Sequence, residues 1–197
     1  SRRMGRSKAL LPKSPGGPTF VRHLSSNLLA GGVADVLVVG RPDDDALRAE
    51  VEGTGTGVRY VVNLHAEDGQ LSSAIAGLNA ADRPGVHAVM VTPVDTPLIQ
   101  PDTVRTLLAT FATRQARVVR ATYRGRHGHP VIFGREVFDA LRHADPAIGA
   151  KAVLRAEAAS LVDVEVDDPG VLHDIDEPER TETSRGFSAS PRRLPAA

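Results

Sequence analysis

Basic residues at the start of the chain are the first candidates for chemistry. The segment SRRMGRSK carries Arg3 and Lys8, with Gly5 between them. A guanidinium binds phosphate oxygens through a fork of N–H donors, a lysine supplies a point charge, and a glycine lets the backbone approach a ligand closely. The combination suits a triphosphate, although it does not match the Walker pattern of a P-loop. The alternative is a solvated basic terminus that binds nothing.

Carboxylates near the ends of apolar runs are the second set of candidates. Asp95 follows the run VHAVMVT and lies between two prolines in PVDTP. It is placed either to bind a hard divalent cation such as Mg²⁺ or to brace the turn before the next helix. Asp174 and Asp176, two positions apart in HDIDEPER, would point to the same side of an extended segment. Asp176 could instead cap the short turn that follows it. Because Mg²⁺ is often held by one or two carboxylates together with substrate phosphates, the three residues together indicate a metal site.

Two further segments could contact a substrate. Gly69, Ser72 and Ser73 stand at the start of a helical pattern, where N–H groups and hydroxyls are available to a polar ligand. Capping of the helix by Ser72 or Ser73 explains the serines equally well. In GRHGHPVIF, Gly128 and His129 belong to a loop that could bring backbone close to an acceptor substrate. The two histidines of this loop lack a third ligand at a suitable spacing, so we do not interpret them as a metal site.

Apolar runs that alternate with helical periods must position these residues. Unbroken apolar strands between helices predict an α/β fold with a mostly parallel sheet covered on both faces. Ligands of such sheets lie beyond the carboxyl ends of the strands, which is where Asp95 falls. The expected strands are residues 34–40, 58–63, 86–92, 116–123, 129–134 and 161–166, and the expected helices lie within residues 19–32, 43–53, 71–82, 101–111, 135–144 and 149–159.

Composition narrows the class of protein. The 197 residues suit one domain, and 24 basic against 24 acidic residues argue against bulk binding of nucleic acid. The chain has no cysteine, which excludes disulfides and favours a reducing, cytoplasmic setting. No apolar run reaches the roughly 18 residues of a membrane span. Residues 183–197 have no apolar period, and we expect them to form a disordered tail.

Taken in order, five segments resemble the MobA/MocA-like nucleotidyltransferases, the group that includes molybdenum cofactor cytidylyltransferase and guanylyltransferase. They are RRMGRSK, GQLSSAIAGL, PVDTPLI, GHPVIFG and HDIDEPER. The resemblance implies an NTP transferase domain over residues 1–182, with a three-layer, Rossmann-like fold of the GT-A type. It also implies transfer of a nucleoside monophosphate from an NTP to a phosphorylated small molecule such as molybdopterin, with release of pyrophosphate. The forms GHPVIF and DID look nearer to the cytidylyltransferases, so CTP is favoured.

The same resemblance assigns roles to the candidates. Attack on the α-phosphorus by a phosphate anion needs positioning and positive charge, and it needs no general base. By position in the motifs, the catalytic residues are Arg3 and Lys8, which bind the triphosphate together with Gly5 and Asp95. The base or ribose is held by Gly69, Ser72 and Ser73, and the acceptor faces Gly128 and His129. The Mg²⁺ ligands are Asp95, Asp176 and Asp174. The alternatives are a glycosyltransferase of the same fold that uses a nucleotide sugar, and a nucleotide-binding module without turnover.

The family's first motif gives the first testable prediction. It begins with an apolar strand and a Leu-Ala-Ala-Gly-x-Ser turn, of which Ser1 matches the last residue. Such a strand buries about four apolar side chains at roughly 1.5–3 kcal/mol each, against a domain stability of about 5–15 kcal/mol. We therefore expect the 197-residue chain alone to be poorly stable and inactive, and a longer chain carrying that strand to melt higher and turn over CTP. Melting curves and pyrophosphate release of the two forms check this, and equal behaviour would contradict it.

Overall fold

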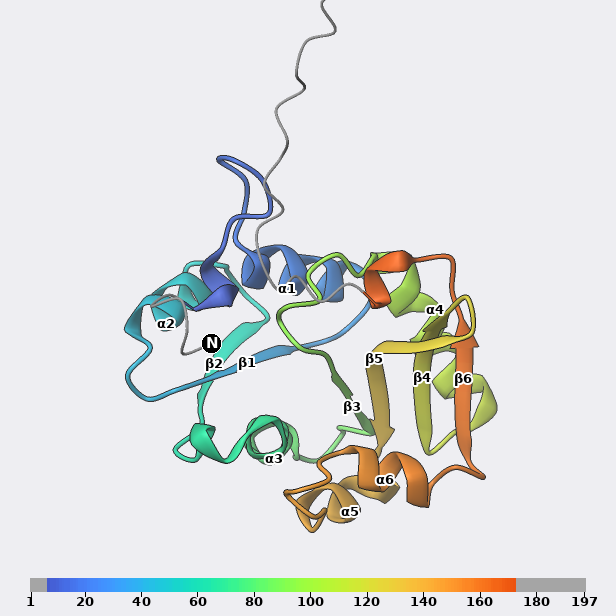
Figure 1. Cartoon of the computed structure of the whole chain (residues 1–197). Helices are drawn as coiled ribbons and strands as arrows, with labels where there is room; N and C mark the ends of the chain where they lie inside the picture. Colours follow the sequence, from blue (N-terminus) through green and yellow to red (C-terminus); the bar gives the residue numbers. More distant parts are fainter. Residues whose placement is uncertain (1–6, 173–197) are drawn as a thin grey trace, which may run out of the picture.

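Strands and helices alternate along the chain in the expected order in the computed structural model, which describes residues 7–172 (Figure 1). Arg3, Gly5, Asp174, Asp176 and the expected tail lie outside these residues. The strands are β1 (Val36–Gly40), β2 (Val58–Val62), β3 (Ala88–Val91), β4 (Val118–Tyr123), β5 (Arg126–Gly134) and β6 (Leu161–Glu165). The α-helices are α1 (Phe20–Ala30), α2 (Asp45–Glu52), α3 (Gln70–Ala81), α4 (Pro101–Arg114), α5 (Phe138–Arg142) and α6 (Lys151–Ala156). The short 3₁₀ helices are η1 (Lys8–Leu10), η2 (Ala66–Asp68), η3 (Arg135–Val137) and η4 (Pro169–Val171).

The strands of the described residues form two sheets. β1 and β2 pair in parallel, and the other four strands form a sheet in the order β3-β5-β4-β6. β5 runs antiparallel to both of its neighbours, whereas β4 and β6 are parallel, so β3, β4 and β6 share one direction. β5 reverses because Arg124 and Gly125, with φ of 49° and 71°, form a tight hairpin turn after β4.

Alternate side chains of β5 pack against helices on opposite faces of its sheet. Val131 and Phe133 belong to a cluster that includes Phe138 of α5 and Val153 of α6. Ile132, between them, packs in a separate cluster with residues of α4 and β6. A strand buried on both faces explains why this segment is an unbroken apolar run. Helix, sheet and helix therefore form the three layers that were predicted, with α3, α5 and α6 together on one side in Figure 1.

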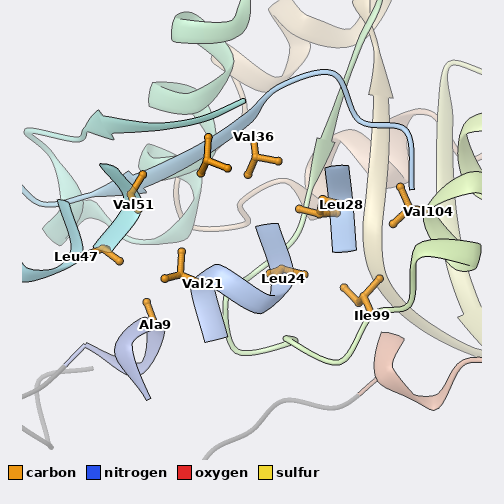
Figure 2. Packing of buried hydrophobic residues seen from close by; sticks show 10 residues of the cluster. Ala9, Val21, Leu24, Leu28, Val36, Leu47, Val51, Ile99 and Val104 are labelled. Carbon is orange, nitrogen blue, oxygen red and sulfur yellow. The ribbon is translucent and has the colours of Figure 1, made fainter. Parts of the chain in front are cut away.

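A third apolar cluster lies around α1 and is called the α1 cluster here (Figure 2). Its buried members are Ala9, Val21, Leu24, Leu28, Val36, Leu47, Val51, Val58, Ile99 and Val104. It joins η1, α1, α2, the β1–β2 sheet and the start of α4. The approach of α4 requires Gly31 at the end of α1, because a Cβ there would lie 2.4 Å from the Cβ of Val104.

The start of α1 is fixed by a polar contact with α2. Thr19 caps α1 by accepting a hydrogen bond from the backbone N–H of Arg22. The Thr19 hydroxyl also donates to Glu50 Oε1 at 2.7 Å, and Arg22 pairs with the same carboxylate at 3.0 Å. The hydrogen bond from Thr19 and the charge of Arg22 hold the pKa of Glu50 below its ordinary value. These contacts set the position of η1 and its neighbours relative to α2.

One expected cap is wrong. Helix α3 begins at Gln70, and its N-cap is Gly69 with φ of +97°, a conformation that favours glycine. Ser72 and Ser73 lie inside the first turn and are therefore not N-caps. No helix among residues 7–172 is both long and apolar enough to cross a membrane.

The α1 cluster gives a stability prediction. Ile99 is 0% exposed within it, so Ile99→Ala should leave a cavity and lower the free energy of unfolding by about 2–5 kcal/mol. Leu64→Ala removes the same number of carbons from a side chain that is 70% exposed, and its cost should stay within about 0.5 kcal/mol. Urea unfolding of the two variants measures the difference. Similar costs for both would show that the cluster does not stabilise the fold.

Candidate active site

The loop between β3 and α4 carries Asp95 and is held rigidly. Thr96 is buried, and its hydroxyl donates to the carbonyl of Pro93 at 2.8 Å and lies 2.9 Å from the hydroxyl of Thr92. At the far end, the Asn27 side chain of α1 donates to the carbonyl of Ile99 at 2.9 Å. Polar contacts within the loop and one long-range contact to α1 therefore fix its backbone.

Asp95 carries a buried polar atom that the described residues leave unsatisfied. Its Oδ1 has no hydrogen-bond partner there, although the atom is shielded from solvent. An unpaired buried acceptor costs about 1–3 kcal/mol, and more when it is charged. A divalent cation would supply the missing partner, so the residue fits the metal-binding role predicted for it. Residues 7–172 hold no cluster of three or more His, Asp or Glu placed to bind a metal by themselves. Further ligands would come from substrate phosphates or from Asp174 and Asp176, which lie outside the described residues.

Lys8 is positioned by the residue that follows it. It begins η1, and Ala9 is 2% exposed in the α1 cluster, which also contains Ile99. The segment of Lys8 and the loop of Asp95 are thus anchored in the same apolar cluster, although 87 positions separate Lys8 from Asp95 in the sequence. Figure 2 shows the side chains of Ala9 and Ile99 on either side of α1. A shared triphosphate between Lys8 and Asp95 stays a prediction.

Asn63 joins the two serines that were predicted to hold base or ribose. It follows β2, is 3% exposed, and donates from Nδ2 to the hydroxyls of Ser72 at 2.9 Å and Ser73 at 3.1 Å. Its Oδ1 accepts from the backbone N–H of His65, and its own N–H donates to the carbonyl of Gly40. Sequence reasoning missed this residue. The available signal was a polar amide directly after a buried apolar strand.

A cavity of about 450 Å³ opens beside these hydroxyls. Asn63 and Ser72 contribute polar groups, while Val62, Leu64 and Ile75 contribute apolar surface. The remaining lining residues are His65, Asp68, Leu71, Ala76, Asn79, Arg142, Ala144 and Pro146. Val62 and Leu64 are among the exposed large apolar side chains of the described residues. Apolar walls with a few fixed polar groups are typical of small-ligand sites.

Gly128 and His129 lie on β5, and the structure supplies a packing reason for the glycine. A Cβ at Gly128 would lie 2.3 Å from the carbonyl oxygen of Val171, so η4 approaches β5 closely at this point. The predicted contact of Gly128 and His129 with an acceptor is not tested by this geometry and stays a prediction.

The chain matches the MobA-like NTP transferase domain family over residues 1–162 and belongs to it. No curated protein matches the chain. Membership of this family supports nucleotidyl transfer as the general activity.

Solved structures agree with the Rossmann-like α/β fold. The Mycobacterium tuberculosis protein Rv0371c superposes with a TM-score of 0.70 at 22% identity, covering 84% of this chain and 83% of that one. Its manganese complex gives a TM-score of 0.64 at 22% identity, covering 82% and 83%. A nucleotidyl transferase from Methanothermobacter gives 0.68 at 22% identity, covering 84% and 78%. A CMP:2-keto-3-deoxy-manno-octonic acid synthetase complexed with CTP gives 0.63 at 15% identity, covering 81% and 83%.

The contacts of Asn63 give the prediction for this site. Asn63→Ala removes both donors to the serine hydroxyls from a buried position, and we expect it to lower the free energy of unfolding by about 1–3 kcal/mol. Asn79→Ala changes an exposed residue of α3 that also lines the cavity. It removes one exposed hydrogen bond, from Arg142, and should cost no more than about 1 kcal/mol. Chemical unfolding measures both values. Equal costs would mean that Asn63 does not order the start of α3.

Proposed function

We propose that this protein transfers a nucleoside monophosphate, from CTP in preference to other NTPs, to a phosphorylated small-molecule acceptor such as molybdopterin, and releases pyrophosphate. The observation that carries the proposal is the buried Asp95 Oδ1 without a hydrogen-bond partner in the described residues, in the loop that follows β3. Membership of the NTP transferase family supports the reaction class. The cysteine-free composition supports a cytoplasmic setting.

A divalent cation held by Asp95, and by Asp176 and Asp174 from the C-terminal motif, would neutralise charge on the polyphosphate. Mg²⁺ is the favoured ion because carboxylates and phosphates are its usual ligands. The manganese complex of the mycobacterial relative supports divalent metal use. A metal and a lysine on the same triphosphate stabilise the charge that develops on the α-phosphate and on the leaving pyrophosphate.

The remaining residues bind and orient the substrates. Arg3, Gly5 and Lys8 hold the triphosphate from the opening motif. The start of α3 holds the base or ribose through Ser72 and Ser73, whose hydroxyls are already oriented by hydrogen bonds from the Asn63 side chain. Fixed hydroxyls lose little entropy when a ligand binds, which favours selective recognition of a nucleoside.

The acceptor is proposed to enter from the β5 side, at Gly128 and His129. The acceptor already carries a phosphate nucleophile, so the chain needs to position it in line with the α-phosphorus rather than to deprotonate it. A neighbour that was solved with CTP has the same fold, which supports a cytidine nucleotide as the donor. The fold alone does not choose the acceptor, and molybdopterin follows from the resemblance of the five motifs.

The test is an NTP panel with Mg²⁺ and molybdopterin, with pyrophosphate as the product measured, on the purified protein. We expect CTP to be the best donor and Asp95→Asn to lower turnover at least about a hundredfold, as loss of an electrostatic contact in the transition state does. Asp102→Asn changes an exposed aspartate in the first turn of α4 and should leave turnover unchanged. Release of a nucleoside diphosphate from a nucleotide sugar, without pyrophosphate from any NTP, would identify a glycosyltransferase instead.

A further inference from the structure

Asp168 is a buried carboxylate with a specific set of partners. It is 5% exposed and lies between β6 and η4. Its Oδ2 accepts from the backbone N–H of Gln100 at 2.9 Å and from the hydroxyl of Thr103 at 2.7 Å. Its Oδ1 accepts from the backbone N–H of Gly170 at 2.9 Å. Both oxygens are therefore used, by donors that are neutral.

These partners belong to two segments that are far apart in the sequence. Gln100 and Thr103 stand at the start of α4, directly after the loop of Asp95, whereas Gly170 lies in η4. The Gln100 side chain makes no capping bond at the start of α4, and the backbone N–H of this N-cap residue donates to Asp168, 68 positions away. A carboxylate at a helix N-terminus is favoured by the helix dipole. One side chain thus joins the end of the Asp95 loop to the last part of the described chain.

Close backbone packing strengthens this junction. A Cβ at Gly170 would lie 2.5 Å from the carbonyl oxygen of Leu98, which is three residues after Asp95. On its other side η4 meets β5, where Gly128 leaves room for the carbonyl of Val171. The segment is therefore held between the Asp95 loop and β5.

We propose that Asp168 is a positioning residue for Asp95: its hydrogen bonds to Gln100, Thr103 and Gly170 fix the end of the Asp95 loop against η4. The proposal rests on the proposed function, because it assumes that Asp95 binds a divalent cation. Both carboxylate oxygens of Asp168 already accept hydrogen bonds from the protein, so its role is to set the backbone that carries Asp95, as outer-shell partners of metal ligands do.

The measurement that tests this role is Mn²⁺ binding to the purified protein in the presence of CTP. It is read from the electron paramagnetic resonance signal of free Mn²⁺. We expect Asp168→Asn and Thr103→Val to weaken Mn²⁺ binding about tenfold or more, since loss of outer-shell contacts has effects of that size. Thr103→Ser keeps the hydroxyl donor and should bind Mn²⁺ like the unmodified protein. Asp95→Asn should abolish the binding and so identifies the site that is measured.

Asp82→Asn is the matched control for stability. Asp82 is the C-cap residue of α3, and its carboxylate pairs with Arg135 and Arg142 rather than with residues of the Asp95 loop. Melting temperatures are recorded for every variant. The proposal is supported if Mn²⁺ binding is weaker in Asp168→Asn and Thr103→Val but unchanged in Asp82→Asn. The three variants are compared at a similar loss of melting temperature.

Three results would overturn the positioning role. The first is unchanged Mn²⁺ binding in folded Asp168→Asn and Thr103→Val. The second is a loss of Mn²⁺ binding in these variants that is no larger than their fraction of unfolded protein. The third is absence of Mn²⁺ binding in the unmodified protein. Failure of the proposed function looks different. In that case Mn²⁺ binds at Asp95 and responds to the Asp168 variants, but no NTP yields pyrophosphate.

Discussion

The packing of apolar side chains around α1 is the constraint on which the candidate site depends. Ala9 and Ile99 are both buried in the α1 cluster. Ala9 directly follows Lys8, and Ile99 lies four positions after Asp95, the two charged residues that the proposed chemistry would use. A lysine and an aspartate can act on one polyphosphate only if their backbones are fixed before the ligand arrives, because a small displacement costs much of the benefit of proximity. Nondirectional apolar packing fixes the segments, and hydrogen bonds then set the orientation of the loop.

Buried polar side chains supply that orientation. Asn63 follows β2, Thr96 belongs to the loop after β3, and Asp168 follows β6; all three are buried. The hydrogen bonds of Asn63 and Asp168 join separate segments, whereas those of Thr96 lie within its own loop. Buried polar groups specify a unique arrangement when they are satisfied and destabilise it when they are not. They lie after strands, on the edge where α/β proteins bind ligands. Asp95 differs from these three residues, because its Oδ1 has no hydrogen-bond partner among residues 7–172, and this contrast supports it as the candidate metal ligand.

The elements were predictable from sequence, whereas most of the contacts within the site were not. Continuous β-branched runs predicted the strands because both faces of the sheet are covered, and Asp95 was found because it follows such a run. Asp168 escaped prediction because its partners lie 65 and 68 positions away and no local pattern encodes them. The wrong cap of α3 has a local cause: the serines suited capping by residue type, but the backbone turn needs the positive φ of Gly69. The sequence suggested that Gly128 brings backbone close to a ligand. The structure gives another reason for the glycine, because a side chain there would collide with the carbonyl of Val171.

The site joins two sheets that are held together by helices. Asn63 ends the β1–β2 sheet, Asp95 follows β3 of the other sheet, and within residues 7–172 the two sheets are not hydrogen-bonded to each other. α1 contacts α4 where Gly31 meets Val104, and α3 packs on both sheets, with Gly77 against Val39 of β1 and Leu78 in the cluster that includes Val89 of β3. Side-chain packing tolerates small shifts that a ladder of backbone hydrogen bonds would resist. The distance between the Asn63 and Asp95 parts of the candidate site is therefore set by α1 and α3.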